Sequence, residues 1–325
     1  MVPYSGHPAT WLLIDDRAGN ASQVRGVGEA LGVRLEIRDI AYSAAGALPN
    51  IVLGASFHGL TASSRVNLVA PWPDLIIAAG RRTAPVARYI KEKNRGKTFL
   101  VQLMNPGDTG IDDFDLICVP RHDRRPPRDN LMSITGAPHR VTEAVLAEAA
   151  GKWADKFTHL AEPRIALLVG GSTKRRKFTP EMALELAALA DRTASAAAGS
   201  LLVSTSRRTD GQAADALAGA LSVPHCVYRW GDEGENPYFG YLGCSSAVIV
   251  TGDSVSMCSE ACATTGPVYI FAPKKLTVAK HGHLHRELYE LGHARPLDGT
   301  FAAWKHPPLN AARAIAAEIR KKMGI

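Results

Sequence analysis

Short apolar runs alternate along this chain with longer segments in which apolar residues recur every three or four positions. The short runs are typical of buried β-strands, and the longer segments are typical of amphipathic helices. Strands that alternate with helices in this way are characteristic of parallel sheets with helices packed on their faces. The pattern therefore predicts an α/β protein.

The first half of the chain is expected to form one such sheet. Several of the strands end in Gly, Asp or Asn, as strand-to-helix turns often do. An amphipathic helix at residues 141–157 and a linker at 159–164, which contains Glu162-Pro163, should close this half. The expected strands are residues 10–14, 34–38, 74–79, 98–104, 116–120 and 131–135, and the expected helices are 22–31 and 84–93.

The same alternation starts again after the linker, and Pro180 suits the first turn of a helix. The expected strands are residues 165–169, 200–204, 226–229, 247–250 and 268–271, and the expected helices are 180–191, 211–221, 254–264, 283–291 and 309–322.

Two Rossmann-like domains in tandem are therefore predicted. They cover residues 1–158 and 159–306, with a C-terminal helix in 307–325. Ligands of open α/β sheets bind beyond the carboxyl ends of the strands. Two such sheets facing each other would enclose a cleft.

Charge changes this picture only modestly. The 325 residues include 38 Lys and Arg against 31 Asp and Glu, a formal net charge of +7. The basic residues gather in short clusters after predicted strands, where they are suited to anions. No nucleic-acid-binding motif accompanies them, so we expect no nucleic-acid partner.

The chain offers no apolar run near the roughly 20 residues of a membrane span, and residues 1–10 lack a signal-peptide pattern. None of the five cysteines forms a CxxC pair. The odd number of cysteines and the lack of a secretion signal favour a reducing compartment. A cytoplasmic location is expected, with peripheral contact at the inner membrane left open.

The first candidate motif is Gly170-Gly171-Ser172-Thr173, directly after a hydrophobic strand and before the basic run 174–177. Glycines let a backbone approach a ligand closely, and free N–H groups there can bind a phosphate. A tight turn followed by a solvated basic loop explains the pattern equally well.

The second motif runs from Thr251 to Ala261. A helix that begins near Ser254 would direct unpaired N–H groups of Val255 and Ser256 towards a diphosphate. Glu260, about one turn further on, could accept hydrogen bonds from ribose hydroxyls. The alternative is an ordinary helix cap with Glu260 opposing the helix dipole.

The third motif places Arg207 and Arg208 beyond another strand, where they could neutralise a departing pyrophosphate or simply be solvated. Arg81 and Arg82 repeat this design in the first half and suggest a second anionic group. Asn105 follows the next strand and is expected to line the cleft.

The first strand-to-helix turn carries Gly19, Asn20 and Gln23, which could hold a sugar. Capping of the helix by Asn20 or Ser22 is the alternative. The turn lacks GxGxxG, so a dinucleotide cofactor is not expected. Asp16, or its neighbour Asp15, is the candidate general base.

Two other patterns are set aside. Tyr89 and Lys93 match the YxxxK of short-chain dehydrogenases without the glycine fingerprint that accompanies it. His281, His283 and His285 have no carboxylate or cysteine fixed beside them, so they are expected to be solvated or phosphate-facing at a helix start. No metal site is predicted.

Seven stretches together resemble the plant mitochondrial fission protein family known as "elongated mitochondria" and its bacterial relatives. The similarity covers nearly the whole chain, and the order of the motifs agrees. They are residues 15–23, 74–108, 117–123, 168–173, 204–209, 236–241 and 251–261.

The resemblance implies the GT-B architecture, with two Rossmann-like domains and a C-terminal helix that crosses back to the first. It also implies that residues 1–158 lie on the acceptor side of a sugar transfer and residues 159–306 on the nucleotide-sugar donor side. Bacterial members are described as glycosyltransferases and sometimes as nucleotide-sugar epimerases. Segments 170–173 and 254–260 are also similar to the donor-binding pieces of the transferase that adds N-acetylglucosamine to lipid-linked peptidoglycan precursors. That similarity implies that Ser254 to Ser256 face the diphosphate and Glu260 the ribose.

Three functions follow from these observations. The first is a metal-independent and cofactor-free glycosyltransferase that uses a nucleotide-diphosphate sugar, with a cell-envelope glycolipid such as a lipid-linked or lipopolysaccharide-type sugar as acceptor. The second is a non-catalytic GT-B-like adaptor at a membrane surface, as the plant family acts. The third is a nucleotide-sugar epimerase, against which the missing GxGxxG argues.

Overall fold

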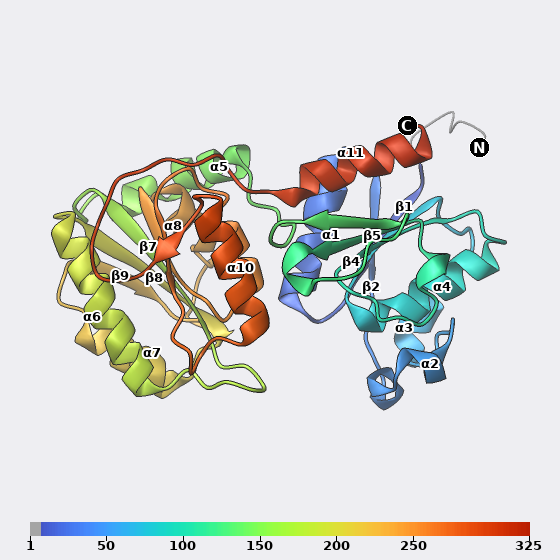
Figure 1. Ribbon diagram of the computed structural model, residues 1–325, viewed down its shortest axis with the longest axis horizontal. Coiled ribbons are helices and arrows are strands. Elements are labelled where there is room, and N and C mark those ends of the chain that lie inside the picture. Colours follow the sequence, from blue (N-terminus) through green and yellow to red (C-terminus); the bar gives the residue numbers. More distant parts are fainter. Residues whose placement is uncertain (1–7) are drawn as a thin grey trace. The chain divides into compact units, whose positions relative to one another are not determined.

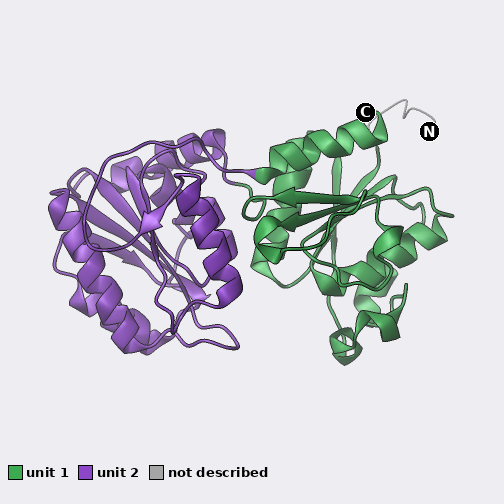
Figure 2. Cartoon of the chain, viewed as in Figure 1, with its two compact units in different colours: residues 1–140, 311–325 green, residues 141–310 purple. Residues whose placement is uncertain are grey.

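The computed structural model describes residues 8–325. The segment examined for a signal peptide, residues 1–10, thus lies largely outside the described range. The chain divides into two compact units, shown in green and purple in Figure 2. Unit 1 runs up to Arg140 and also contains Ala311–Ile325, and unit 2 is Val141–Asn310.

Unit 1 is built on a six-stranded parallel sheet in the order β2-β1-β3-β4-β5-β6. Three of these strands, β1, β3 and β5, are buried at every position and apolar except at Thr10, as expected where helices cover both faces. The strands are β1 (Thr10–Ile14), β2 (Leu35–Asp39), β3 (Leu75–Ala79), β4 (Phe99–Leu103), β5 (Leu116–Pro120) and β6 (Leu131–Ile134).

Helices cover both faces of this sheet. On one face α1 (Ala18–Leu31) and α11 (Ala311–Met323) share a core with Leu12 and Ile77. On the other, α4 (Ala84–Lys93) packs on Trp11 and Ile76. The chain between β2 and β3 forms two short helices, α2 (Asn50–Leu53) and α3 (Ala62–Val66). Single 3-10 turns occur at Ala44–Ala47, Arg81–Thr83, Ile111–Asp113 and Arg121–Asp123.

The C-terminal helix α11 belongs to unit 1 although residues 141–310 separate it from the rest of that unit. Figure 1 shows α11 in red beside α1 in blue. Ile315 and Ile319 are fully buried against the sheet. The expected return of this helix to the N-terminal domain is confirmed.

Unit 2 repeats the design with the sheet order β12-β11-β10-β7-β8-β9, again all parallel. Its strands are β7 (Arg164–Gly171), β8 (Ser200–Arg208), β9 (His225–Tyr228), β10 (Ala247–Thr251), β11 (Val268–Phe271) and β12 (Arg295–Pro296). Its helices are α5 (Glu143–Trp153), a 3-10 turn at Ala154–Phe157, α6 (Pro180–Ala196), α7 (Gly211–Ala220), α8 (Tyr238–Gly243), α9 (Val255–Ala261) and α10 (Ala279–Glu290).

The boundary between the units lies earlier than the expected position after residue 158. Helix α5 and the turn after it belong to unit 2, because Trp153 and Phe157 enter its core. The Phe157 ring meets the Tyr241 ring edge-on at 5.4 Å between centroids. Residues 307–310 also stay with unit 2, where the Leu309 N–H donates to the carbonyl of Cys262 at 2.8 Å.

Most expected elements are present, and the differences lie at their ends. Helices α1 and α10 each begin four residues before the expected position, and β8 extends to Arg208. Helices α2, α3 and α8 and strand β12 were not expected, because elements of two to six residues have no detectable periodicity. Among the described residues no helix is long and apolar enough to cross a membrane.

Candidate functional site

The carboxyl ends of β7 and β10 are joined in unit 2 by a chain of hydrogen bonds. The Gly170 N–H donates to Oγ1 of Thr251 at 2.7 Å, and this hydroxyl donates to Oδ1 of Asp253, also at 2.7 Å. All three residues are buried. A buried hydroxyl that both accepts and donates fixes the direction of each bond, so the turn after β10 has a defined position relative to β7.

Arg208, the last residue of β8, ties the third strand into the same network. Its Nη1 lies 2.8 Å from Oδ2 of Asp253, whose side chain is fully buried, and 3.2 Å from the carbonyl oxygen of Ser172. A buried carboxylate requires such a partner. The strand ends of β7, β8 and β10 therefore meet around Asp253, a residue that the sequence did not single out.

The two glycines at the end of β7 are required by this packing. A Cβ on Gly170 would lie 2.5 Å from the carboxylate oxygens of Asp253, and one on Gly171 would lie 2.3 Å from the carbonyl oxygen of Arg208. Gly171 also has a φ of +116°, which other residues rarely adopt. The close approach expected of a ligand is thus made here by the protein itself.

The loop after Gly171 is closed by its own polar groups. Oγ of Ser172 accepts from the Phe178 N–H at 3.0 Å, and Oγ1 of Thr173 accepts from the Arg176 N–H at 3.1 Å. The basic run 174–177 on this loop is exposed. Arg207 is exposed as well, whereas its neighbour Arg208 is paired with Asp253. Of the two adjacent arginines, Arg207 is therefore the one available to an external anion.

The turn after β10 leads into α9. Ser254 is the N-cap, and its Oγ accepts from the Met257 N–H at 3.4 Å. Within the described part of the chain, no acceptor takes the N–H groups of Val255 and Ser256, and both residues are half-buried. These two N–H groups remain available to a ligand, whereas the Ser254 side chain already accepts from the next N–H along the helix, that of Met257.

Glu260 lies one turn into α9 and is buried. Its Oε2 accepts a hydrogen bond of 2.7 Å from the hydroxyl of Tyr238, which lies at the start of α8. Burial, together with the nearby Glu260 charge, raises the pKa of Tyr238 well above its ordinary value, so the phenol stays a donor. The predicted ribose contact of Glu260 would have to share this carboxylate with Tyr238.

Two histidines of α10 pack against the β10–α9 turn. A Cβ on Gly252 would lie 2.5 Å from Cε1 of His285, which is buried, so of the two expected alternatives the solvated His285 is wrong. The His281 side chain lies close enough to Asp253 to interact electrostatically with its carboxylate. Burial lowers its pKa and the Asp253 charge opposes that shift, so the ring is neutral at pH 7. The i, i+4 spacing was the signal that could have placed both on one helix face.

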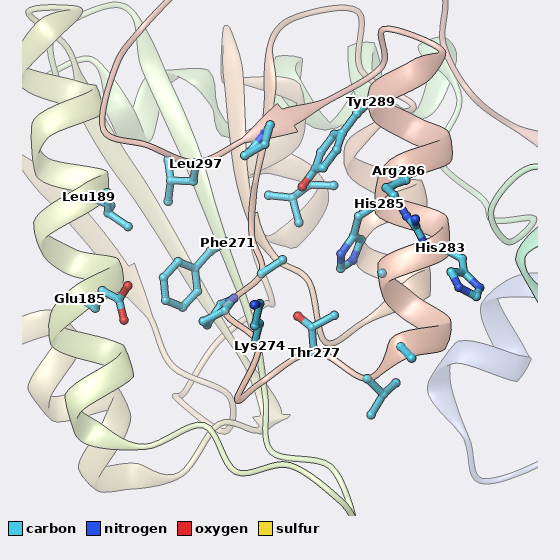
Figure 3. Close-up of a pocket in the computed structure, with 17 residues that line it drawn as sticks. Glu185, Leu189, Phe271, Lys274, Thr277, His283, His285, Arg286, Tyr289 and Leu297 are labelled. Atoms are coloured by element: carbon cyan, nitrogen blue, oxygen red, sulfur yellow. The ribbon is translucent and has the colours of Figure 1, made fainter.

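A cavity of about 690 Å³ opens beyond the carboxyl end of β11, between α6 and α10. Figure 3 shows Phe271, Leu189 and Leu297 along one side of it and His285, Thr277 and Tyr289 along the other, with Lys274 between them. Mostly apolar walls with a few polar groups are typical of small-molecule pockets of this size. His285 also contacts the β10–α9 turn, so the cavity adjoins the Asp253 network.

The corresponding edge of unit 1 is organised around Asp15, whose side chain is buried. It accepts from Nδ2 of Asn20 at 3.2 Å and from the Arg17 N–H at 3.2 Å, and it lies 3.5 Å from Nη2 of Arg82. The neighbouring Asp16 is exposed and lies 2.6 Å from the same Nη2. Asp15 is thus bound on several sides, and Asp16 is the carboxylate that an external group can reach.

Helix α1 begins at Ala18 with Arg17 as its N-cap, so Gly19, Asn20, Ser22 and Gln23 lie within the helix. The alternative expectation that Asn20 or Ser22 caps this helix is therefore wrong. Gln23 is buried.

The side chains of Arg81 and Asn105 are both engaged in hydrogen bonds within unit 1. Nη1 of Arg81 donates to the carbonyl of Leu48 at 2.8 Å and to Oδ1 of Asn50 at 2.9 Å. Oδ1 of Asn105 accepts from the Gly107 N–H at 2.9 Å and so closes its turn. Because its guanidinium already has these two partners, Arg81 is less available to an anion than its sequence position suggests.

The guanidinium of Arg82 stacks on the ring of Tyr42, and its Cζ lies 4.1 Å from the ring centroid.

Among residues 8–325, no three His, Cys, Asp or Glu side chains are grouped so that they could hold a metal ion.

Two parallel six-stranded Rossmann-like sheets with a C-terminal helix on the first define the GT-B fold. The spinosyn forosaminyltransferase SpnP matches with a TM-score of 0.56 at 12% identity, covering 98% of this chain and 95% of that protein. The UDP-GlcNAc 2-epimerase of Methanocaldococcus jannaschii matches with a TM-score of 0.55 at 9% identity, covering 96% and 98%. At these identities the likeness shows the fold.

The chain belongs to the mitochondrial fission ELM1 family, whose match spans residues 18–323. It is 29% identical to the mitochondrial fission protein ELM1 of Arabidopsis thaliana over 84% of this chain and 69% of that protein. It is 28% identical to an uncharacterized protein of Rickettsia prowazekii (strain Madrid E), over 95% and 97%. The predicted family, with its bacterial relatives, is confirmed.

Proposed function

We propose that this chain binds a nucleotide-diphosphate sugar at the carboxyl edge of the unit 2 sheet and transfers the sugar without a catalytic metal or cofactor. The observation that carries the proposal is the joining of three strand ends around Asp253, which fixes the turn that presents Val255 and Ser256. Ligands of open parallel sheets bind at this edge. Arg207 and the exposed run 174–177 supply positive charge.

A diphosphate suits these groups chemically. In the proposed complex the N–H groups of Val255 and Ser256 donate to its oxygens, and Arg207 approaches from the end of β8. The cavity beside His285 receives another part of the same ligand. These contacts become stronger as the C1–O bond to the diphosphate breaks, because negative charge then accumulates on the departing oxygen.

The transfer needs a base for the acceptor. In the proposed reaction an acceptor hydroxyl forms the new bond to C1, the diphosphate leaves with the electron pair of the old bond, and the hydroxyl proton passes to a carboxylate. Asp16 of unit 1 is the proposed base, supported by its exposure. A cell-envelope glycolipid is the proposed acceptor.

Calorimetric titration of the full chain with UDP, GDP, ADP and CMP tests the proposal. We expect at least one of them to bind, and Arg207→Gln to weaken that binding about tenfold, the effect of one charge-assisted hydrogen bond. Lys97→Gln, which removes an exposed charge from unit 1, is the matched control and should bind normally. Absence of binding by all four would reject the nucleotide site and favour the adaptor function.

An epimerase is the second candidate, because the fold is shared with UDP-GlcNAc 2-epimerases, one of which was solved with UDP-GlcNAc and UDP. Incubation with UDP-GlcNAc separates the two functions. A product epimeric at C2, formed without any acceptor, would favour the epimerase, whereas sugar release only in the presence of an acceptor supports transfer.

A further inference from the structure

The chain between β2 and β3 forms an apolar lobe, residues 40–73, at one end of unit 1 (Figure 1). It contains α2 and α3 and is held together by backbone hydrogen bonds. The Ser43 N–H donates to Gly59 and the Thr61 N–H to Ala41, both at 3.0 Å. The lobe is therefore an ordered part of the unit.

The lobe presents large aliphatic side chains to the solvent. In α2, Asn50 and Leu53 point inward and are buried, whereas Ile51 is 77% exposed and Val52 is 65% exposed. Leu48, in the extended segment just before α2, is 43% exposed. Val66, at the end of α3, is 70% exposed and Val69 is 56% exposed. Five of the nine exposed large apolar side chains among the described residues thus lie within these 34 positions.

The frame of unit 1 fixes this aliphatic surface in place. Nδ2 of Asn50 donates to the carbonyl of Pro106 at 2.9 Å and to that of Arg81 at 3.1 Å, and the Arg81 guanidinium donates back to Leu48. Ile51 and Val52 are consequently held outward by their anchored neighbours. Folding provides no internal partner for them, and an exposed group of this kind marks an interaction surface.

Charge indicates which partner covers it. No Asp or Glu occurs between Asp39 and Asp74, although the chain has 31 acidic residues in 325. The lobe carries Arg65 and His58, and the chain as a whole has a net charge of +7. An anionic surface would therefore meet no like charge on the lobe, and aliphatic groups without carboxylates are suited to the headgroup boundary of a bilayer.

We propose that the apolar lobe docks unit 1 on an anionic lipid bilayer, with Ile51, Val52 and Leu48 entering the headgroup boundary. The surface lies in unit 1, and the proposed nucleotide contacts lie in unit 2. The membrane-docking proposal therefore does not depend on the nucleotide site.

Co-sedimentation of the full chain with phospholipid vesicles tests this proposal. We expect binding to phosphatidylcholine vesicles that contain phosphatidylglycerol, weaker binding to phosphatidylcholine alone, and a decrease when salt is raised. The double variant Ile51→Ser, Val52→Ser should reduce the vesicle partition coefficient at least about tenfold, because each buried aliphatic side chain contributes strongly to transfer. Val66→Ser should reduce it as well.

The matched control is Leu184→Ser, Leu291→Ser, which removes two leucines of unit 2 that are 49% and 51% exposed and should leave vesicle binding unchanged. Equal binding of the wild type and the Ile51, Val52 variant would overturn the proposal. So would a vesicle-independent dimer, detected by light scattering, that the variant abolishes, since a second copy of the chain would then cover the lobe. Calorimetry with nucleotides on the same variant reports separately on the nucleotide site.

Discussion

The guanidinium of Arg208 and the carboxylate of Asp253 form an ion pair of 2.8 Å at the meeting point of three strand ends in unit 2. The carboxylate is fully buried and the arginine side chain is about one-third exposed. Since Asp253 also accepts from Thr251, one acidic residue holds both the turn into α9 and the end of β8. Stability and ligand binding in unit 2 should therefore both depend on it.

We expect Asp253→Asn to lower the free energy of unfolding by about 3 kcal/mol, because it leaves Arg208 without its partner in a largely buried position. The midpoint of urea unfolding of unit 2 measures this effect. Asp112→Asn breaks the exposed pair with Arg128 and should cost less than about 1 kcal/mol. Equal losses of unfolding free energy in the two variants would show that the Asp253–Arg208 pair contributes no more to stability than an exposed pair does.

Gly170→Ala should be costly in both stability and function. Its Cβ would lie 2.5 Å from the Asp253 carboxylate, so the network must shift, with a loss of at least about 2 kcal/mol and of nucleotide binding. Thermal unfolding and calorimetry measure the two losses. Gly219→Ala in α7 is the control, since nothing lies within 4 Å and alanine favours the helix by about 1 kcal/mol. Normal nucleotide binding by Gly170→Ala would contradict the dependence of the nucleotide site on the Asp253 network.

Tyr238→Phe should destabilise unit 2 by about 1–3 kcal/mol, because the buried Glu260 carboxylate loses a donor. The pKa of Tyr238 is raised in the folded state, so its contribution is complete below the unfolded value of about 10 and is lost as pH rises above it. Unfolding midpoints at neutral and alkaline pH should therefore differ less for the variant than for the wild type. An unchanged pH dependence would refute this.

The buried pair His293 and His306, with Nδ1 atoms 3.2 Å apart, should make the protein acid-sensitive. Burial, and then the nearby His306, lowers the pKa of His293, so the unfolded chain binds a proton more readily than the folded one. Stability is therefore complete above the unfolded pKa of about 6.5 and falls as the pH drops below it. His293→Gln should flatten the profile of urea midpoints between neutral and mildly acidic pH. The exposed His58→Gln should not, and if both behave alike the pair is not the cause.

The hydrophobic pattern was sufficient to predict both sheets and most of their strands, because strands buried on both faces are nearly continuous apolar runs. β1, β5 and β11 have the expected bounds. The short helices α2 and α3 could not be predicted in this way. They depend on contacts with distant residues, such as Asn50 with Pro106.

The sequence by itself determined the two Rossmann-like domains, the family and the strand ends at which polar motifs gather. Only the tertiary structure decided which of those polar residues are already occupied: Arg208 by Asp253, Glu260 by Tyr238, and Arg81 by Leu48 and Asn50. The physical reason is that periodicity reports whether a position is buried or exposed. A hydrogen bond or ion pair depends on the distance between residues far apart in the chain, which packing alone sets.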